Sequence, residues 1–241
     1  MTNYPSLSFF HKKKQEDQQT TNNMMNGNGE EEEQGKELIN KPLPLIADAF
    51  EELSKFLLRN NTQKEDLRLV PFTDACSLVS VLFNCLGIAF KFAEMEYCAK
   101  VRGLVEASKQ YETLENILDH DVENDTVRKP GSLSRNLRRV RQGLDLIRAL
   151  FEQFLSADEC SLREAASSAY AQVCAPYHTW AVRTAVFAGM YALPSREQLL
   201  LKLNETDQTV EKEMRRYMKA SIPVIEYIDK LYISRNITLD W

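Results

Sequence analysis

The sequence predicts an all-α protein, and three observations carry that prediction. Apolar residues recur at spacings of three and four over most of residues 37–241, as on the buried face of a helix. Strand-like alternation is scarce in this range, which holds only five of the eight glycines. The most regular apolar stripe consists of Leu137, Val140, Leu144, Ile147, Phe151 and Phe154.

The N-terminal half of this range divides into three helical segments. Pro44 can open a first helix that continues to Leu57 and ends in a polar turn. A second helical segment covers residues 72–108, and Gly87 marks a break or a kink within it. A shorter helix is expected over residues 111–124.

Proline and glycine punctuate the C-terminal half. After Pro130 and Gly131, Ser132 or Ser134 can cap the helix that carries the regular stripe. A further helix is expected over residues 162–191 and stops at Leu193-Pro194, because proline ends a helix. Two more helices are expected over residues 195–204 and 206–234, the last one kinked near Pro223.

The chain divides into two kinds of material. Residues 1–36 are polar, acidic and rich in Asn and Gln, so we expect a disordered low-complexity tail. This tail is a possible arm for protein partners, although it contains no motif. Residues 37–241 read as one domain. Its most apolar stretch, residues 75–90, is too short to span a bilayer and is expected to be a buried core helix.

Composition removes several classes of function. A net charge of -5 gives no support for nucleic-acid binding. The five cysteines are odd in number and none has CxxC spacing, so neither a disulfide framework nor a zinc site is expected. The N-terminus has no apolar segment typical of a secretory signal. A reducing, cytoplasmic location is therefore expected, with no cofactor and no metal.

The strongest chemical signal is a cluster of cations. Residues 128–141 contain six Lys or Arg side chains in fourteen positions. Arg135 and Arg139 are four residues apart, so on a helix they share a face. Such a cluster is often a solvated surface. It can also form an anion site, because two adjacent guanidiniums can clamp a phosphate through charge-assisted hydrogen bonds.

Other polar residues are less specific by themselves. Glu96 and Lys100 have the spacing of a surface ion pair on a helix. His178 lies among aromatic residues, where histidine is more often part of the core than a ligand contact. No GxSxG, P-loop, GxGxxG, HExxH or paired CxxC motif is present, so the sequence offers no reason to propose an enzyme.

Three longer segments together carry a family resemblance. They are CSLVSVLFNCLGIAFKFAEMEYCAKV, SLSRNLRRVRQGLDLIRALFEQF and YAQVCAPYHTWAVRTAVFAGMYALP. The third contains the pattern His178-x-Trp180…Tyr191-Ala192-x-Pro194. With these segments, residues 40–241 resemble the glycolipid transfer protein family. The resemblance is closest to its plant accelerated-cell-death branch, whose members bind ceramide-1-phosphate.

The resemblance implies a fold and a function. The family fold is a two-layer sandwich of helices, with a surface recess for one sphingolipid head group and an apolar interior pocket for its chains. We therefore expect transfer of ceramide-1-phosphate or a related phosphorylated sphingolipid between membranes, with transient membrane contact and no covalent chemistry. The branch also suggests a link to programmed cell death.

The resemblance also implies roles for individual residues. Lys100, Arg135 and Arg139 match the phosphate-contacting positions. The sugar-binding branch has Trp at the position of Arg139 and Asn at that of Lys100. His178 matches the histidine that donates to the acyl carbonyl. Glu96 stands where the family has Asp, which accepts from the sphingoid amide; the longer side chain can still reach it or turn toward Lys100 or Arg135.

The lipid-chain pocket is predicted from apolar stripe positions, which could equally be plain helix packing. The candidates are Phe50, Phe83, Phe90, Ile147, Phe151, Phe154, Val182 and Phe187. Trp180 could lie at a membrane-facing rim or in the core. Two other functions stay open: a glycosphingolipid carrier, against which Arg139 argues, and a lipid sensor or interaction module, which only the tail favours. A sphingolipid-modifying enzyme is a weaker alternative.

Overall fold

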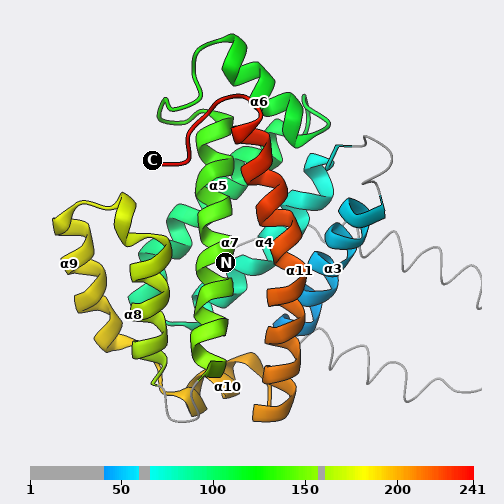
Figure 1. The fold of residues 1–241 in the computed structure, drawn as a ribbon. Helices are drawn as coiled ribbons and strands as arrows, with labels where there is room; N and C mark the ends of the chain where they lie inside the picture. The colour runs from blue at the N-terminus through cyan, green and yellow to red at the C-terminus, as the bar shows by residue number, and fades with distance from the viewer. Residues whose placement is uncertain (1–40, 60–65, 157–160) are drawn as a thin grey trace, which may run out of the picture. The chain divides into compact units, whose positions relative to one another are not determined.

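Helices make up the regular structure of the described residues, apart from one isolated bridge between Arg68 and Thr113. The computed structural model describes residues 41–59, 66–156 and 161–241. The all-α prediction is confirmed (Figure 1). The predicted tail, residues 1–36, lies outside the described residues. The helices are α3 (Pro42–Arg59), α4 (Leu69–Cys85), α5 (Lys91–Ala107), α6 (Leu114–Glu123), α7 (Leu133–Ser156), α8 (Leu162–Val173), α9 (Trp180–Gly189), α10 (Arg196–Leu203) and α11 (Asp207–Ile233).

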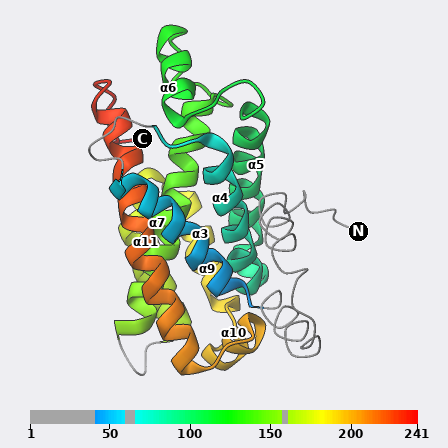
Figure 2. The same cartoon turned by 90° about the vertical axis from the view of Figure 1, so that its right-hand side faces the viewer.

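The long helices pack in two layers, as expected. Helices α3, α4 and α5 pack side by side in one layer, and α11, α7 and α8 do so in the other. The layers meet where α3 lies on α11 and α5 lies on α7 (Figure 2). Helix α7 touches α5, α8 and α11, so its apolar stripe is buried at the centre of the fold.

Local sequence signals explain where several helices begin. Thr113 and Ser161 each accept a hydrogen bond from the backbone N–H three residues later, and the side chain at that position bonds back to the cap. At α7 the Ser132 hydroxyl accepts from the Arg135 N–H, which favours Ser132 over Ser134 as its cap. The Asp121 carboxylate accepts from the Ser134 N–H and places a negative charge at the positive end of α7.

Breaks in the chain separate some expected helices. The segment 72–108 is divided at Gly87, whose φ of 80° suits glycine. A short 3-10 turn, η2 (Ile88–Phe90), follows Gly87 and leads into α5. The prediction of a single helix over residues 162–191 is wrong. Instead α8 ends at Val173, a second 3-10 turn η3 (Ala175–Tyr177) contains Pro176, and His178 is extended before α9 starts. A proline cannot donate the backbone hydrogen bond that would continue the helix.

Helix α11 shows the opposite behaviour. It continues through Pro223 to Ile233, although proline removes one backbone hydrogen bond. Its apolar face is buried on both sides of the proline. The buried residues there are Ala220, Val224, Ile225 and Ile228. Packing over the length of the helix offsets the missing bond. Within the described residues, no helix is long and apolar enough to cross a bilayer.

The close approach of α5 to α7 positions the candidate site. A Cβ atom at Gly143 of α7 would lie 2.5 Å from the Tyr97 ring of α5, so only glycine allows this contact. The Tyr97 hydroxyl donates to the Cys76 carbonyl oxygen at 3.0 Å, which fixes the ring between α4 and α7. This contact holds α5 against the α7 turns that carry the arginine cluster.

Candidate functional site

Helix α7 carries two groups of arginines with different partners. Arg141 and Arg148 form ion pairs with Asp145, and Arg141 also pairs with Asp229 of α11. By contrast, Arg135, Arg138 and Arg139 form no ion pair with a carboxylate of the described residues. Buried or half-buried guanidiniums without an opposite charge are costly, and a bound anion relieves that cost.

Arg139 is the centre of this group. It is half-buried, and burial is the largest cause that lowers its pKa, followed by the positive charges of Arg135 and Arg138. Glu96 acts in the opposite direction. The Arg139 guanidinium donates from Nη1 to Oε1 of Gln142 at 2.6 Å. The positive charges of Arg135, Arg138 and Arg139 therefore lie close enough to act on one another, and a bound anion would be stabilised by all three.

Arg135 lies one helical turn before Arg139. Its Nη1 donates to the backbone carbonyl oxygen of Arg128 at 2.8 Å, across the loop that precedes α7. Arg128 in turn contacts the C-terminal segment through Thr238, and its guanidinium lies over the Trp241 ring. One side of Arg135 is thus held by the loop, while its charge still acts on Arg139.

Helix α5 contributes Glu96 and Lys100. The two side chains form an ion pair with 3.5 Å between Nζ and Oε2. Of the orientations open to the longer Glu96 side chain, this structure therefore has the one that turns toward Lys100. Glu96 is exposed and Lys100 is half-buried, and α5 packs directly on α7. Lys100 is held beside a carboxylate that an incoming anion would have to displace.

His178 lies in the connection between α8 and α9, where the charge of Arg139 acts on it. Its Nδ1 is 2.9 Å from the Tyr170 hydroxyl of α8. Burial lowers the pKa of His178, and the charges of Arg139 and Arg183 lower it further. The imidazole is therefore neutral at neutral pH. It can offer only one N–H, on one of its two ring nitrogens.

Five residues predicted from the resemblance are thus brought into one region. Helix α7 supplies Arg135 and Arg139, α5 supplies Glu96 and Lys100, and the α8–α9 connection supplies His178. The charges of Glu96 and Arg135 act on Arg139, and that of Arg139 acts on His178. The arrangement can bind an anion through the cations and a carbonyl group through the imidazole.

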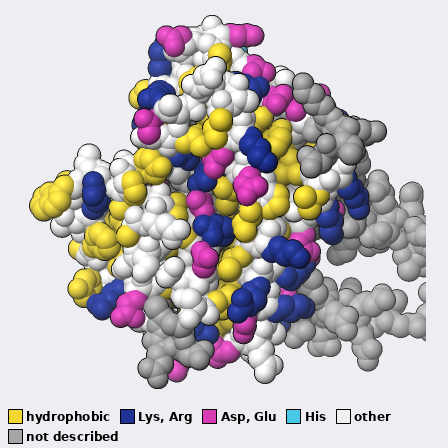
Figure 3. Space-filling model, in the orientation of Figure 1, with side chains coloured by type: hydrophobic (Ala, Val, Ile, Leu, Met, Phe, Trp, Pro, Cys, Tyr) yellow, Lys and Arg dark blue, Asp and Glu magenta, His cyan; other side chains and the backbone are white. Residues whose placement is uncertain are grey.

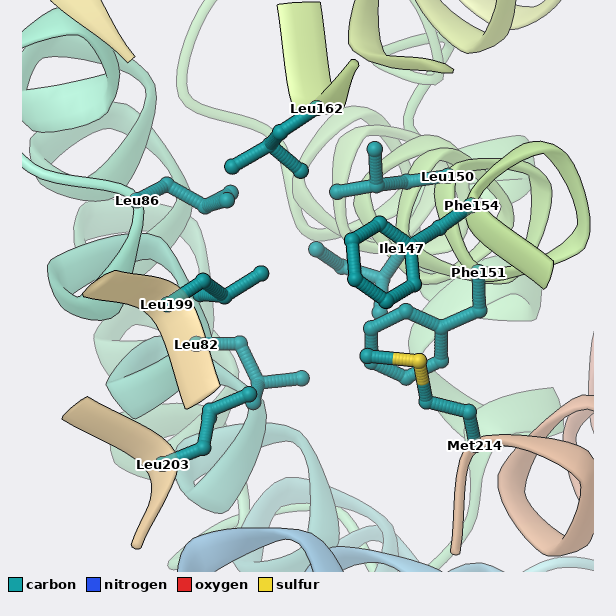
Figure 4. Close-up of a pocket in the computed structure, with 10 residues that line it drawn as sticks. All are labelled: Leu82, Leu86, Ile147, Leu150, Phe151, Phe154, Leu162, Leu199, Leu203 and Met214. Carbon is teal, nitrogen blue, oxygen red and sulfur yellow. The ribbon is translucent and has the colours of Figure 1, made fainter. Parts of the chain in front are cut away.

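The predicted pocket residues are only partly brought together. Ile147, Phe151 and Phe154 of α7 line an apolar cavity of about 10 Å³ between the layers. Their side chains point toward Leu82, Leu199 and Met214 (Figure 4). Phe50, Phe83 and Phe90 are buried in the surrounding core. A cavity of this size holds about one water molecule, so hydrocarbon chains enter only if the lining side chains move apart.

Val182 and Phe187 are not in this interior pocket. Both lie on α9, where they are 42% and 39% exposed, and no residue of α9 is fully buried. The break at residues 174–179 turns α9 away from the core, which helical spacing within α9 could not predict. Phe187 instead faces a separate open cleft of about 330 Å³ between α8 and α9, together with Arg163, Ser167 and Tyr191.

A comparison with protein families identifies this architecture. The model of the family described as "Glycolipid transfer protein (GLTP)" matches residues 67–205, more than half of the chain. The chain belongs to the glycolipid transfer protein family. The resemblance drawn from its three sequence segments is confirmed.

Two relatives from Arabidopsis thaliana are particularly similar. The ACD11 homolog protein is 68% identical over 206 residues, which cover 84% of this chain and 90% of the relative. Accelerated cell death 11 is 47% identical over 203 residues, which cover 84% of this chain and 97% of the relative.

Solved structures of this family show the same fold. An aspartate-to-asparagine variant of Arabidopsis ACD11 complexed with C12 ceramide-1-phosphate is 47% identical. It matches with a TM-score of 0.80 over 83% of this chain and 98% of that one. Human ceramide-1-phosphate transfer protein in complex with 12:0 ceramide-1-phosphate is 21% identical, with a TM-score of 0.69, over 80% and 96% of the two chains. The two-layer prediction is confirmed at the level of the fold.

Two residues that contact the site of this glycolipid transfer protein family member were not predicted from the sequence. Gln142 is buried, its Oε1 accepts from Arg139, and its Nε2 has no partner in the described residues. Tyr170 is buried and bonds to His178. The spacing of Gln142, three residues after Arg139, was a usable signal. For Tyr170 no comparable signal exists, because its eight-residue distance from His178 spans the break between helices.

Proposed function

We propose that this chain binds one ceramide-1-phosphate-type sphingolipid and moves it between membranes. Arg135 and Arg139, which lack a carboxylate partner in the described residues, are the observation that carries the proposal. Lys100, released from Glu96, is the third phosphate contact. The two ACD11 relatives and the ACD11 structure with ceramide-1-phosphate support the same head group.

The amide group of the lipid is recognised next to the phosphate. His178 donates to the acyl carbonyl, and Glu96 accepts from the amide N–H. In this structure Glu96 pairs with Lys100. Lipid binding therefore exchanges one ion pair for two contacts, with phosphate on Lys100 and the amide N–H on Glu96. The Nε2–H₂ group of Gln142, which has no partner among the described residues, is a neutral donor to the phosphate beside Arg139.

The lipid chains occupy the interior between the two helical layers. Ile147, Phe151 and Phe154 line the small cavity there, and the chains displace neighbouring side chains on entry. Each CH₂ group buried contributes about 0.8 kcal/mol, so a chain of about sixteen carbons leaves a membrane only at a cost of roughly 10 kcal/mol or more. An apolar interior that opens for the chains lowers this cost. Carriage of this kind requires no covalent chemistry.

The comparison of two head groups tests this function. Transfer of ceramide-1-phosphate between vesicles is expected to exceed that of glucosylceramide by at least about tenfold, because a neutral sugar leaves the guanidiniums unpaired. Fluorescent donor and acceptor vesicles give both rates. Equal or faster transfer of the sugar lipid would assign the chain to glycosphingolipids instead. Mass spectrometry of lipid that co-purifies with the protein gives an independent answer.

An apolar surface next to the site is the membrane-docking face. Trp180 of α9 is 77% exposed, and Ile88 of η2 is 83% exposed. Phe92 and Tyr191 are similarly exposed, and η2 packs against α9 and against the 3-10 turn η4 (Met190–Ala192). Apolar side chains gather over α9 in the space-filling view (Figure 3). Docking is transient, because a few side chains enter the interface and nothing in the described residues spans the bilayer.

Replacing Trp180 with alanine tests the docking face. Binding to vesicles is expected to fall about tenfold, because the indole ring no longer enters the interface. Binding of a short-chain ceramide-1-phosphate in solution stays unchanged, since Trp180 is exposed and lies outside the phosphate cluster. Vesicle sedimentation and calorimetry measure the two quantities. Leu58→Ala, at an exposed leucine of α3, is the matched control; equal losses in both variants would exclude a dedicated face.

The cellular setting follows from the thiols and the tail. Cys76, Cys85, Cys98 and Cys174 are free thiols, which fits a reducing compartment such as the cytoplasm. The acidic residues 1–36 are a possible arm for protein partners. Their deletion, with lipid transfer and partner capture measured in parallel, separates a carrier from a lipid sensor. Loss of partners with intact transfer favours the sensor.

A further inference from the structure

Tyr170 of α8 reaches the head-group region without belonging to the cluster of charges. Its side chain is buried, and its hydroxyl lies 2.9 Å from Nδ1 of His178. The centroids of the Tyr170 and His178 rings are 5.7 Å apart, and the Tyr170 and Phe187 rings form a T-shaped pair with centroids 5.6 Å apart. The phenol is therefore fixed by aromatic contacts, while its hydroxyl points at one nitrogen of the imidazole.

The surroundings decide which atom carries the proton. Arg139 on α7 and Arg183 on α9 both disfavour a positive charge on His178, whose pKa is lowered first by burial. Burial raises the pKa of Tyr170, so the phenol keeps its hydrogen. An imidazole nitrogen is a stronger base than a phenol oxygen. The favoured arrangement has the Tyr170 hydroxyl donating to Nδ1 and the remaining imidazole proton on Nε2.

We propose that Tyr170 is a positioning residue that fixes His178 with its proton on Nε2 and thereby makes it a hydrogen-bond donor for the acyl carbonyl of the lipid. The proposal rests on the proposed function, and it deepens it. A proton on Nδ1 would leave Nε2 as an acceptor, which repels a carbonyl oxygen. Tyr170 therefore selects ligands that present an acceptor at this point.

Tyr170→Phe is a conservative test, because it removes the hydroxyl and keeps the ring that packs on Phe187. In the lipid-free protein, nitrogen NMR reports the tautomer and the pKa of His178, and the His178→Gln variant assigns its signals. The wild-type ring is expected to carry its proton on Nε2 alone. In Tyr170→Phe we expect a mixture of tautomers and a higher pKa, because the lost hydroxyl donated to Nδ1 of the neutral ring and is a weaker acceptor for the protonated one. The same tautomer and pKa in both proteins would overturn the proposal.

A double-mutant cycle tests the consequence for lipid transfer. In the protein that keeps His178, Tyr170→Phe is expected to lower ceramide-1-phosphate transfer about fivefold, which is the effect of one hydrogen bond. The amide of His178→Gln donates without any tautomer, so in that background Tyr170→Phe is expected to change transfer by less than about twofold. Equal losses in both backgrounds would mean that Tyr170 has a structural role only.

The two measurements also separate this proposal from the proposed function. If the wild-type protein neither binds nor transfers ceramide-1-phosphate, the function fails. The NMR result on lipid-free protein still decides whether Tyr170 fixes the tautomer. If transfer is normal and the tautomer does not depend on Tyr170, only the proposal about Tyr170 fails.

Discussion

Replacing Arg139 with tryptophan and Lys100 with asparagine is expected to lower ceramide-1-phosphate transfer by at least about a hundredfold. Each charge-assisted hydrogen bond contributes roughly 1.5–3 kcal/mol, and the double change removes two of them from one phosphate. Arg139 is half-buried among like charges, so its contact with an anion is poorly screened by solvent. Vesicle transfer assays measure the rate.

The fold should survive this double change, because both side chains are only half-buried. Lys100 pairs only with Glu96, and Arg139 bonds only to Gln142 among the described residues. Circular dichroism is expected to show unchanged helicity. The matched control is Arg215→Trp with Lys109→Asn, which changes the same residue types at exposed ion pairs. Unchanged transfer in the first variant, or equal loss in the control, would remove Arg139 and Lys100 from the site.

Replacing Leu150 with tryptophan is expected to block long lipid chains selectively. Leu150 lines the interior cavity of about 10 Å³, beside Phe154 and Leu162. The indole ring occupies space that the chains would need, and fitting an oversized group into a packed interior costs about 1–3 kcal/mol, so long-chain transfer should fall about tenfold or more. A ceramide-1-phosphate with two short chains binds through its head group, so its affinity should change by less than about twofold.

Two controls accompany the Leu150 variant. Leu150→Met conserves volume and is expected to keep transfer of both lipids near the wild-type rate. Leu58→Trp adds the same ring at an exposed position of α3. Thermal unfolding establishes that each variant is folded before transfer is compared. If Leu150→Trp transfers long-chain lipid at the wild-type rate, the chains do not occupy this interior region.

Much of the site could be predicted from the sequence, because its residues lie in short segments. The spacing of Arg135 and Arg139 places them on one face of α7 by helix geometry alone. The same reasoning pairs Glu96 with Lys100. That these two helices meet at the cluster follows from the family resemblance, and the contact of Tyr97 with Gly143 is its physical basis.

The sequence by itself determined the helical class, most helix limits and the family, because apolar spacing, capping residues and proline act locally. Only the tertiary structure decided which arginines are paired, since Asp229 reaches Arg141 from α11. It also decided that no residue of α9 is fully buried, that the interior cavity is small, and that Tyr170 faces His178. These facts depend on how separate helices pack, and an apolar side chain has the same sequence signature in a core, a pocket or an exposed face.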